Sequence, residues 1–219
     1  MRKIILPLML MIVLLMAGCG QEEPKETPEL ALEEIKAALE QYDHEKFSAR
    51  VDVNSLLNMA YDDATLELAG RVEDFGAVYR DDPFFRNRAE DIIMYNELHR
   101  DEHMKFIREI VSKCFDRQLV SSNAFDEDTI ASVAAELRHY YSTARSTVES
   151  STIDQNRATL RLNVVFESLY AGGEYSMPLE LTFEKESERW ILKRVSNVGE
   201  IIVPLVDIAE ILWPDQFNF

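Results

Sequence analysis

The chain has 219 residues, 40 of them acidic against 23 lysines and arginines, and its formal net charge is −17. Such a charge repels nucleic-acid phosphates and anionic lipid head groups, so binding to DNA or RNA is not expected. The acidity is most simply explained by solubility, and the alternative is that the surface binds a cationic protein partner. A chain of this length can bury about 70% of its unfolded surface, which is enough for one domain with its own core.

The first residues have the features of a secretory signal. The positive pair Arg2-Lys3 is followed by an uninterrupted apolar run from Ile4 to Met16. This run is shorter than the roughly 20 residues that a membrane-spanning helix needs. A positive start, a short apolar run and small residues before a cleavage point are typical of a signal peptide. We therefore expect residues 1–18 to be removed and residues 19–28 to form an acidic tether.

The expected cleavage point also contains a candidate modification site. The segment Met16-Ala17-Gly18-Cys19 resembles the lipobox of bacterial lipoproteins, although that family usually has Leu where Met16 stands. The resemblance implies that Cys19 carries acyl chains such as palmitate. It also implies that the protein is anchored outside the cytoplasm, to the cell membrane or the outer membrane. Gly20 is not the Asp that signals inner-membrane retention in enteric lipoproteins, so the choice of membrane stays open.

The other cysteine is expected to be unreactive. If Cys19 is acylated, Cys114 has no partner for an intramolecular disulfide. Its neighbours in sequence include Ile110, Val111 and Phe115, and apolar burial raises the pKa of a thiol. We expect Cys114 to be a buried thiol without a catalytic role.

Residues 29–141 are predicted to be mostly helical. Apolar residues recur there at the three- to four-residue spacing of amphipathic helices. Thr27-Pro28 and Asp82-Pro83 each combine a capping residue with proline at the first helical position. The stretch after Asp82-Pro83 continues to about Leu119, and the charged cluster around Asp101 is where it would divide into two helices.

The periodicity changes over residues 143–196, where apolar and polar residues alternate on both sides of Gly172-Gly173. This alternation predicts an antiparallel meander with one buried and one solvated face. Thr182 falls on the solvated face. Pro178 lacks a backbone donor, which predicts a sheet edge or a bulge at that position. The expected core face consists of Leu160, Leu162, Leu179, Leu181, Phe183 and Trp190.

The order of the elements indicates the fold class. Helices before strands, followed by an apolar segment over 198–213, favour one α+β domain, 29–219, with the helices on one face of the sheet. A meander with Trp190 in its last strand resembles the cone-shaped cystatin-like and nuclear-transport-factor-like folds, which include enzymes and binding modules. The first helices also resemble those of an uncharacterised bacterial family without an assigned activity, through Ala31, Ile35, Asp43, Phe47 and Val51-Asp52.

One motif suggests catalysis. His99-Arg100-Asp101-Glu102-His103 matches the H-x-x-E-H pattern of inverzincin metallopeptidases. The resemblance implies that His99 and His103 bind zinc from one helix face and that Glu102 activates a metal-bound water. Those enzymes use a larger chain and a further acidic ligand, which this sequence does not single out. Five consecutive polar residues are better explained by a solvated helix turn or helix junction, so we expect no metal and no cofactor.

Aromatic residues supply another candidate site. Tyr170, Tyr175, Trp190 and Trp213 come from the strand region and the C-terminal segment. Core packing accounts for them. They would also line an apolar pocket if the helices and a curved sheet formed a cone.

These observations favour a non-enzymatic binding or envelope-interaction module for a small apolar ligand or a cationic protein. The alternative is a hydrolase or metal-dependent enzyme that uses His99, Glu102 and His103, or acids in a cone pocket. A buried histidine or carboxylate directed into the cone would favour the enzyme. A purely apolar interior would favour binding.

Overall fold

The computed structural model describes four stretches of the chain, namely residues 26–80, 82–119, 129–167 and 173–212. The expected signal peptide and Cys19 lie outside these stretches. Two of the four candidate pocket aromatics, Tyr170 and Trp213, also lie outside them.

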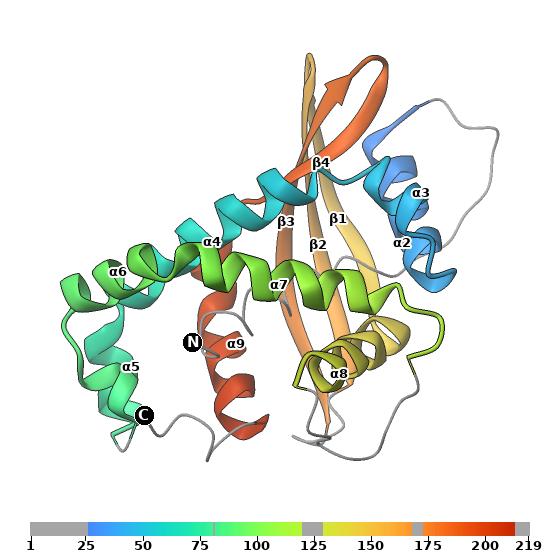
Figure 1. Cartoon of the computed structure of the whole chain (residues 1–219). Helices are drawn as coiled ribbons and strands as arrows, with labels where there is room; N and C mark the ends of the chain where they lie inside the picture. Colours follow the sequence, from blue (N-terminus) through green and yellow to red (C-terminus); the bar gives the residue numbers. More distant parts are fainter. Residues whose placement is uncertain (1–25, 81, 120–128, 168–172, 213–219) are drawn as a thin grey trace.

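The fold class is α+β, as predicted, with helices before and after a four-stranded antiparallel sheet (Figure 1). The α-helices of the described stretches are α2 (Pro28–Glu40), α3 (His44–Ser48), α4 (Val53–Gly70), α5 (Val72–Val78), α6 (Ala89–Leu98), α7 (Arg100–Cys114), α8 (Thr129–Thr143) and α9 (Val198–Leu212). A short 3-10 helix, η1 (Pro83–Arg86), lies between α5 and α6. The strands are β1 (Arg145–Asp154), β2 (Arg157–Glu167), β3 (Glu174–Glu186) and β4 (Arg189–Val195). None of the helices in these stretches has the length and apolar character needed to cross a membrane.

Polar side chains begin two of these helices where the sequence predicts. The side chain of Thr27 caps α2, and that of Asp82 caps η1, with proline at the first turn of each helix. The central helical stretch does divide in two. The division falls at His99, between α6 and α7, and the charged residue Asp101 lies within the first turn of α7.

The strands follow one another in the sheet in sequence order, each antiparallel to the next. In the β2–β3 pair, Leu160 lies opposite Leu181 and Leu162 lies opposite Leu179. Directly opposite residues point to the same side of a sheet, so these four leucines share one face. All six predicted core-face residues are buried, which confirms the predicted register of the meander.

Two details of β3 depend on the residues after β4. Strand β4 pairs only with the second half of β3. Beside the first half, the Asn197 side chain accepts a hydrogen bond from the Glu180 amide at 2.8 Å and donates one to the Pro178 carbonyl at 3.1 Å. Pro178 therefore lies at a local sheet edge, as predicted. The prediction of a solvated Thr182 is wrong: this residue is 3% exposed because Ser196, whose Oγ lies 2.6 Å from its Oγ1, covers it.

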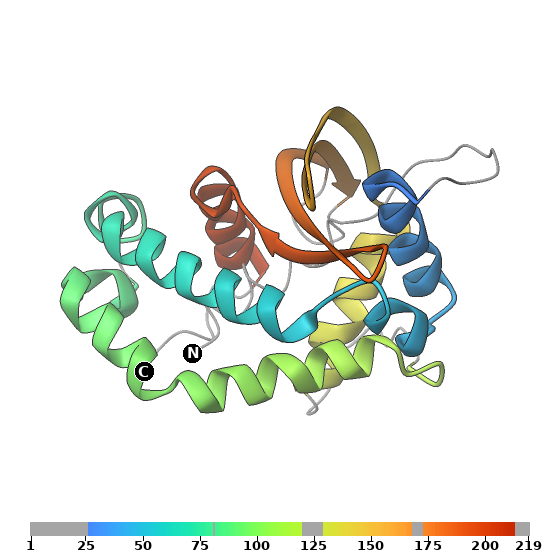
Figure 2. The same ribbon diagram turned by 90° about the horizontal axis from the view of Figure 1, so that it is seen from above.

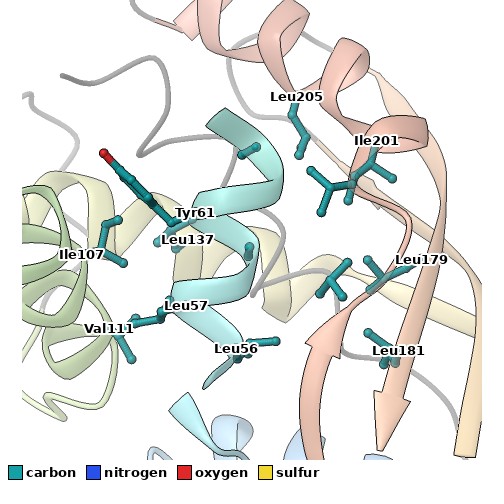
Figure 3. Close-up of a cluster of buried hydrophobic side chains, with 14 of the residues drawn as sticks. Leu56, Leu57, Tyr61, Ile107, Val111, Leu137, Leu179, Leu181, Ile201 and Leu205 are labelled. Atoms are coloured by element: carbon teal, nitrogen blue, oxygen red, sulfur yellow. The ribbon is translucent and has the colours of Figure 1, made fainter. Parts of the chain in front are cut away.

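Helix α4 lies at the centre of the core. It runs beside α7 (Figure 2) and separates α7 from the sheet and α9 (Figure 3). The close-up shows apolar side chains meeting there from four helices and one strand: Leu56, Leu57 and Tyr61 of α4, Ile107 and Val111 of α7, Leu137 of α8, Leu179 and Leu181 of β3, and Ile201 and Leu205 of α9.

A buried arginine fixes the beginning of the described chain to the sheet. Arg50 forms ion pairs with Glu26 and Glu34. Glu26 also accepts a hydrogen bond from the Trp190 amide of β4 at 2.9 Å. The Arg50 guanidinium holds the pKa of Glu26 below its usual range. Residue 26, where the described chain begins, is thereby held beside β4.

The prediction of a buried Cys114 is confirmed. Its side chain lies among apolar residues at the end of α7, and Sγ approaches the Ala134 carbonyl of α8 at 3.8 Å. Burial raises the pKa of this thiol to about 12, so the reactive thiolate is not formed at neutral pH.

Candidate functional site

The two histidines of the H-x-x-E-H pattern lie at the junction of α6 and α7. His99 precedes α7 and His103 lies one turn later, with their rings stacked at a centroid distance of 5.9 Å. They share one side of the helix, as predicted. The prediction of a solvated turn is wrong for His103, which is completely buried because Tyr61 of α4 packs against it.

Tyr61 holds His103 through a buried hydrogen bond. The Tyr61 hydroxyl lies 2.7 Å from Nδ1 of His103 and donates to the Asn96 carbonyl oxygen at 3.1 Å. Since a hydroxyl has one proton to donate, Nδ1 of His103 must carry its own proton and donate it to Tyr61. Burial lowers the pKa of His103 to about 4 and raises the pKa of Tyr61 to about 12. Both groups are therefore uncharged at neutral pH.

The histidines lack the companions that a zinc site requires. Nδ1 of His103 is bonded to Tyr61, and its Nε2 is buried with no hydrogen-bond partner among the described residues. Glu102 approaches Nδ1 of His99 at 3.5 Å with its carboxylate largely exposed. No three His, Cys, Asp or Glu side chains in the described stretches are grouped so that they could hold a metal ion. Nδ1 of His103 is thus engaged in a buried hydrogen bond with Tyr61.

Asn96 extends this hydrogen bonding to the inner face of α6. Its side chain is completely buried, and Nδ2 lies 3.3 Å from Oγ1 of Thr65 on α4. We call Tyr61, Thr65, Asn96 and His103 the polar network. Because its members come from α4, α6 and α7, the network fixes the position of α6 against the other two helices.

An apolar pocket opens on α6 beside the polar network. Its volume is about 490 Å³, within the range of small-molecule sites. Phe84 and Ile92 are buried at the pocket, whereas Met94 is 64% and Leu98 is 78% exposed. The full lining consists of Phe84, Asn87, Asp91, Ile92, Met94, Tyr95 and Leu98.

Two packing features hold the pocket in place. Helix α5 approaches η1 so closely that a Cβ at Gly76 would lie 2.8 Å from the Phe85 carbonyl oxygen, so only glycine fits there without a shift. On the other side, the ring of Tyr95 lies 4.5 Å from the ring of His99. The pocket is therefore formed by elements that are fixed to their neighbours, which limits the rearrangement that a ligand would require.

The sequence did not reveal this pocket. Ile92 is buried, whereas Leu98, which is also apolar and lies on the same helix, is exposed. The buried positions on α6 are Ile92 and Asn96, so a polar residue occupies the inner face while Met94 and Leu98 point outward. Met94 and Leu98 are four residues apart and therefore lie on a common helix face. This spacing is the sequence feature from which an apolar patch on α6 could have been predicted.

The predicted aromatic pocket residues that the structure describes are not brought together. Tyr175 stacks on Phe166 with ring centroids 5.8 Å apart, and Trp190 is buried at the start of β4. Trp190 lies opposite Lys185 of β3, ten residues along the strand from Tyr175. At about 3.3 Å per residue, the two positions are roughly 30 Å apart.

One buried carboxylate lies on the sheet-facing helix α8. Burial raises the pKa of Glu136. Tyr140, one turn later on α8, makes an edge contact with Phe166 of β2 at 5.5 Å between centroids. Glu136 is the feature that the enzyme alternative would use, because a protonated carboxyl group can act as a general acid.

Comparisons with known proteins do not assign a family. No protein-family model matches the chain, and no curated protein matches it. Among solved structures, the chain is similar to one titled as a variant of Rd1NTF2_05, at 20% sequence identity and a TM-score of 0.26. The match covers 29% of this chain and 54% of that chain, about half of its length.

Proposed function

We propose that this protein is a lipid-anchored binding protein outside the bacterial cytoplasm, and that its ligand site is the pocket on α6. The observation that carries the proposal is the open apolar pocket with Met94 and Leu98 exposed at its rim. Exposed apolar side chains gathered at a pocket commonly mark a binding surface, whereas the same side chains scattered singly need no explanation.

The position of the pocket in the molecule fits an anchored protein. Glu26, which lies within the expected tether of residues 19–28, is held beside β4 near α2 and α3. The helices α5 and α6 lie at the opposite end of the molecule (Figures 1 and 2). A chain anchored through Cys19 would thus have its pocket at the end away from the attachment of the tether.

The enzyme alternative has less support from this geometry. His103 is completely buried and bonded to Tyr61, so a substrate has no access to it without rearrangement of α4 and α7. Glu102 is exposed, but its partner His99 lacks a further ligand among the described residues. An enzyme based on Glu136 would need a second reacting group beside this carboxyl group.

The anchor is tested by counting thiols in the protein purified from membranes. If Cys19 is acylated, native protein has no reactive thiol because Cys114 is buried, and denatured protein has one. The Cys19→Ser variant should lose fatty-acid labelling and still show one thiol on denaturation. One reactive thiol in native wild-type protein, or fatty-acid labelling that survives in the variant, would contradict the anchor.

The pocket is tested with a cysteine placed at its rim. In the anchored full-length protein, Leu98→Cys provides an exposed thiol that a water-soluble maleimide can modify, whereas Cys114 stays unreactive. Indole, a small aromatic probe, should slow the modification of Leu98→Cys in a saturable manner. The matched control is Ile153→Cys, an exposed apolar position on β1, where indole should have no effect. Equal rates with and without indole at Leu98→Cys would contradict the binding site.

A further inference from the structure

The exposed side of α6 combines the apolar rim of the pocket with two acidic residues. Glu90 and Glu97 are exposed, and neither lies in a direct ion pair with another described residue, although the charge of Glu90 also acts on Arg88. Met94 lies four residues after Glu90 and three before Glu97, so the three side chains project from the same side of the helix. A rise of 1.5 Å per residue separates the two carboxylates by about 10 Å along the helix axis.

The arginines near the pocket make their direct contacts with other groups than these two carboxylates. Arg88 is paired with Asp91 at 3.1 Å, and the Arg86 guanidinium donates to the Arg80 carbonyl at 3.1 Å. Glu90 and Glu97 thus place two carboxylates without a direct ion pair along one border of the pocket. The net charge of −17 on the whole chain acts in the same direction.

The combination of acidic and apolar side chains on α6 favours some binding partners of the pocket over others. A second copy of the chain would bring Glu90 and Glu97 close to carboxylates of the same type, which is unfavourable. An anionic membrane surface is repelled for the same reason. A partner segment that carries apolar and basic side chains satisfies both features at once, in the manner of a helix bound in a groove.

Resting on the proposed function of the pocket, we infer that its ligand is a basic amphipathic helical segment of a protein partner. Apolar side chains of this segment occupy the pocket against Ile92, Met94 and Leu98. Two basic side chains spaced two helical turns apart pair with Glu90 and Glu97. The pocket supplies the apolar contact and the two carboxylates supply the selectivity for positive charge.

The inference is tested with three labelled helical peptides and the anchored full-length protein in zwitterionic lipid nanodiscs. The first peptide has leucines on one face and lysines two turns apart at the border of that face. The second replaces these lysines with glutamates, and the third keeps the lysines and replaces the leucines with serines. Fluorescence anisotropy, with empty nanodiscs subtracted, should show saturable binding of the first peptide only.

Variants of the protein separate the two contributions. Glu90→Gln combined with Glu97→Gln should weaken binding of the lysine–leucine peptide about threefold to tenfold and reduce its salt dependence, since each exposed ion pair contributes modestly. Met94→Gln combined with Leu98→Gln should weaken it about tenfold or more. The matched charge control, Glu40→Gln with Glu45→Gln, removes two exposed carboxylates near the far end of the molecule and should change affinity less than twofold.

Each other outcome overturns the inference in a recognisable way. Equal affinity for the glutamate and lysine peptides would show that charge is not selected. Equal affinity for the serine and leucine peptides would show that the apolar pocket is not used. If no peptide binds while indole still protects Leu98→Cys, the pocket binds a small apolar ligand, so the proposed function stands and the helical partner is wrong.

Discussion

The sheet core and the α6 end of the molecule differ in how far their apolar side chains are buried. Leu160, Leu179 and Leu181 on the sheet are completely buried, whereas Met94 and Leu98 on α6 are 64% and 78% exposed. The inner face of α6 contains Asn96 in place of an apolar residue, and it is held by hydrogen bonds to α4. The sheet side is therefore stabilised by burial of apolar surface, whereas the α6 end combines buried apolar residues with a polar network and leaves Met94 and Leu98 exposed.

The largest expected effect lies in the sheet core. Leu181→Ala should lower the free energy of unfolding by about 2–5 kcal/mol, since it removes buried methyl groups and leaves a cavity. Thr182 is not a suitable control because it is buried and bonded to Ser196. Thr152→Ala, at an exposed position of β1, should change the free energy of unfolding by less than about 0.5 kcal/mol in urea. Similar losses in both variants would contradict the assigned core face.

The next effect tests whether the α6 end depends on a neutral histidine. The folded pKa of His103 is about 4, below the usual histidine value of 6.5, so unfolding takes up a proton at intermediate pH. The stability that neutral His103 contributes is therefore complete above pH 6.5 and is lost as the pH falls toward 4. At pH 4 the resulting loss in the free energy of unfolding is at most about 3 kcal/mol.

The comparison with His103→Gln isolates this contribution. The variant has no group that titrates at this position, so its stability should fall less between pH 6.5 and 4 than that of the wild-type protein. Urea unfolding at several pH values measures the difference. Parallel pH profiles for the two proteins would mean that His103 is protonated in the folded state and that the polar network is described wrongly.

A smaller effect is expected from removal of one hydroxyl in the polar network. Tyr61→Phe leaves Nδ1 of His103 and the Asn96 carbonyl oxygen without this partner, which typically reduces stability by about 1–3 kcal/mol. Tyr95→Phe is the matched control, because the Tyr95 side chain lines the pocket and is half-buried. Tyr95→Phe should lower the free energy of unfolding by no more than about 0.5 kcal/mol. An equal loss of stability in Tyr61→Phe and Tyr95→Phe would contradict the conclusion that the hydrogen bonds of the polar network stabilise the α6 end.

The sequence predicted the sheet better than it predicted the site, and the reason is physical. Alternation of apolar and polar residues specifies the core face because a shift of one residue would expose every leucine of β2 and β3. On α6 the helical periodicity is ambiguous, since Asn96 is buried and Leu98 is exposed. Burial of His103 depends on Tyr61, which is 42 residues away in sequence, and no local pattern contains that contact.

The smallest expected effect on stability is at the pocket rim, and it separates a binding surface from a core. Met94→Gln with Leu98→Gln should change the free energy of unfolding by less than about 0.5 kcal/mol, because both side chains are already largely in water. Ile92→Ala, which alters the buried side of the same pocket, should reduce it by about 2–5 kcal/mol. A large loss from the rim variant would mean that Met94 and Leu98 pack against the protein in solution. The α6 end would then stabilise itself as the sheet core does, and the exposed apolar surface on which the binding proposal rests would not exist.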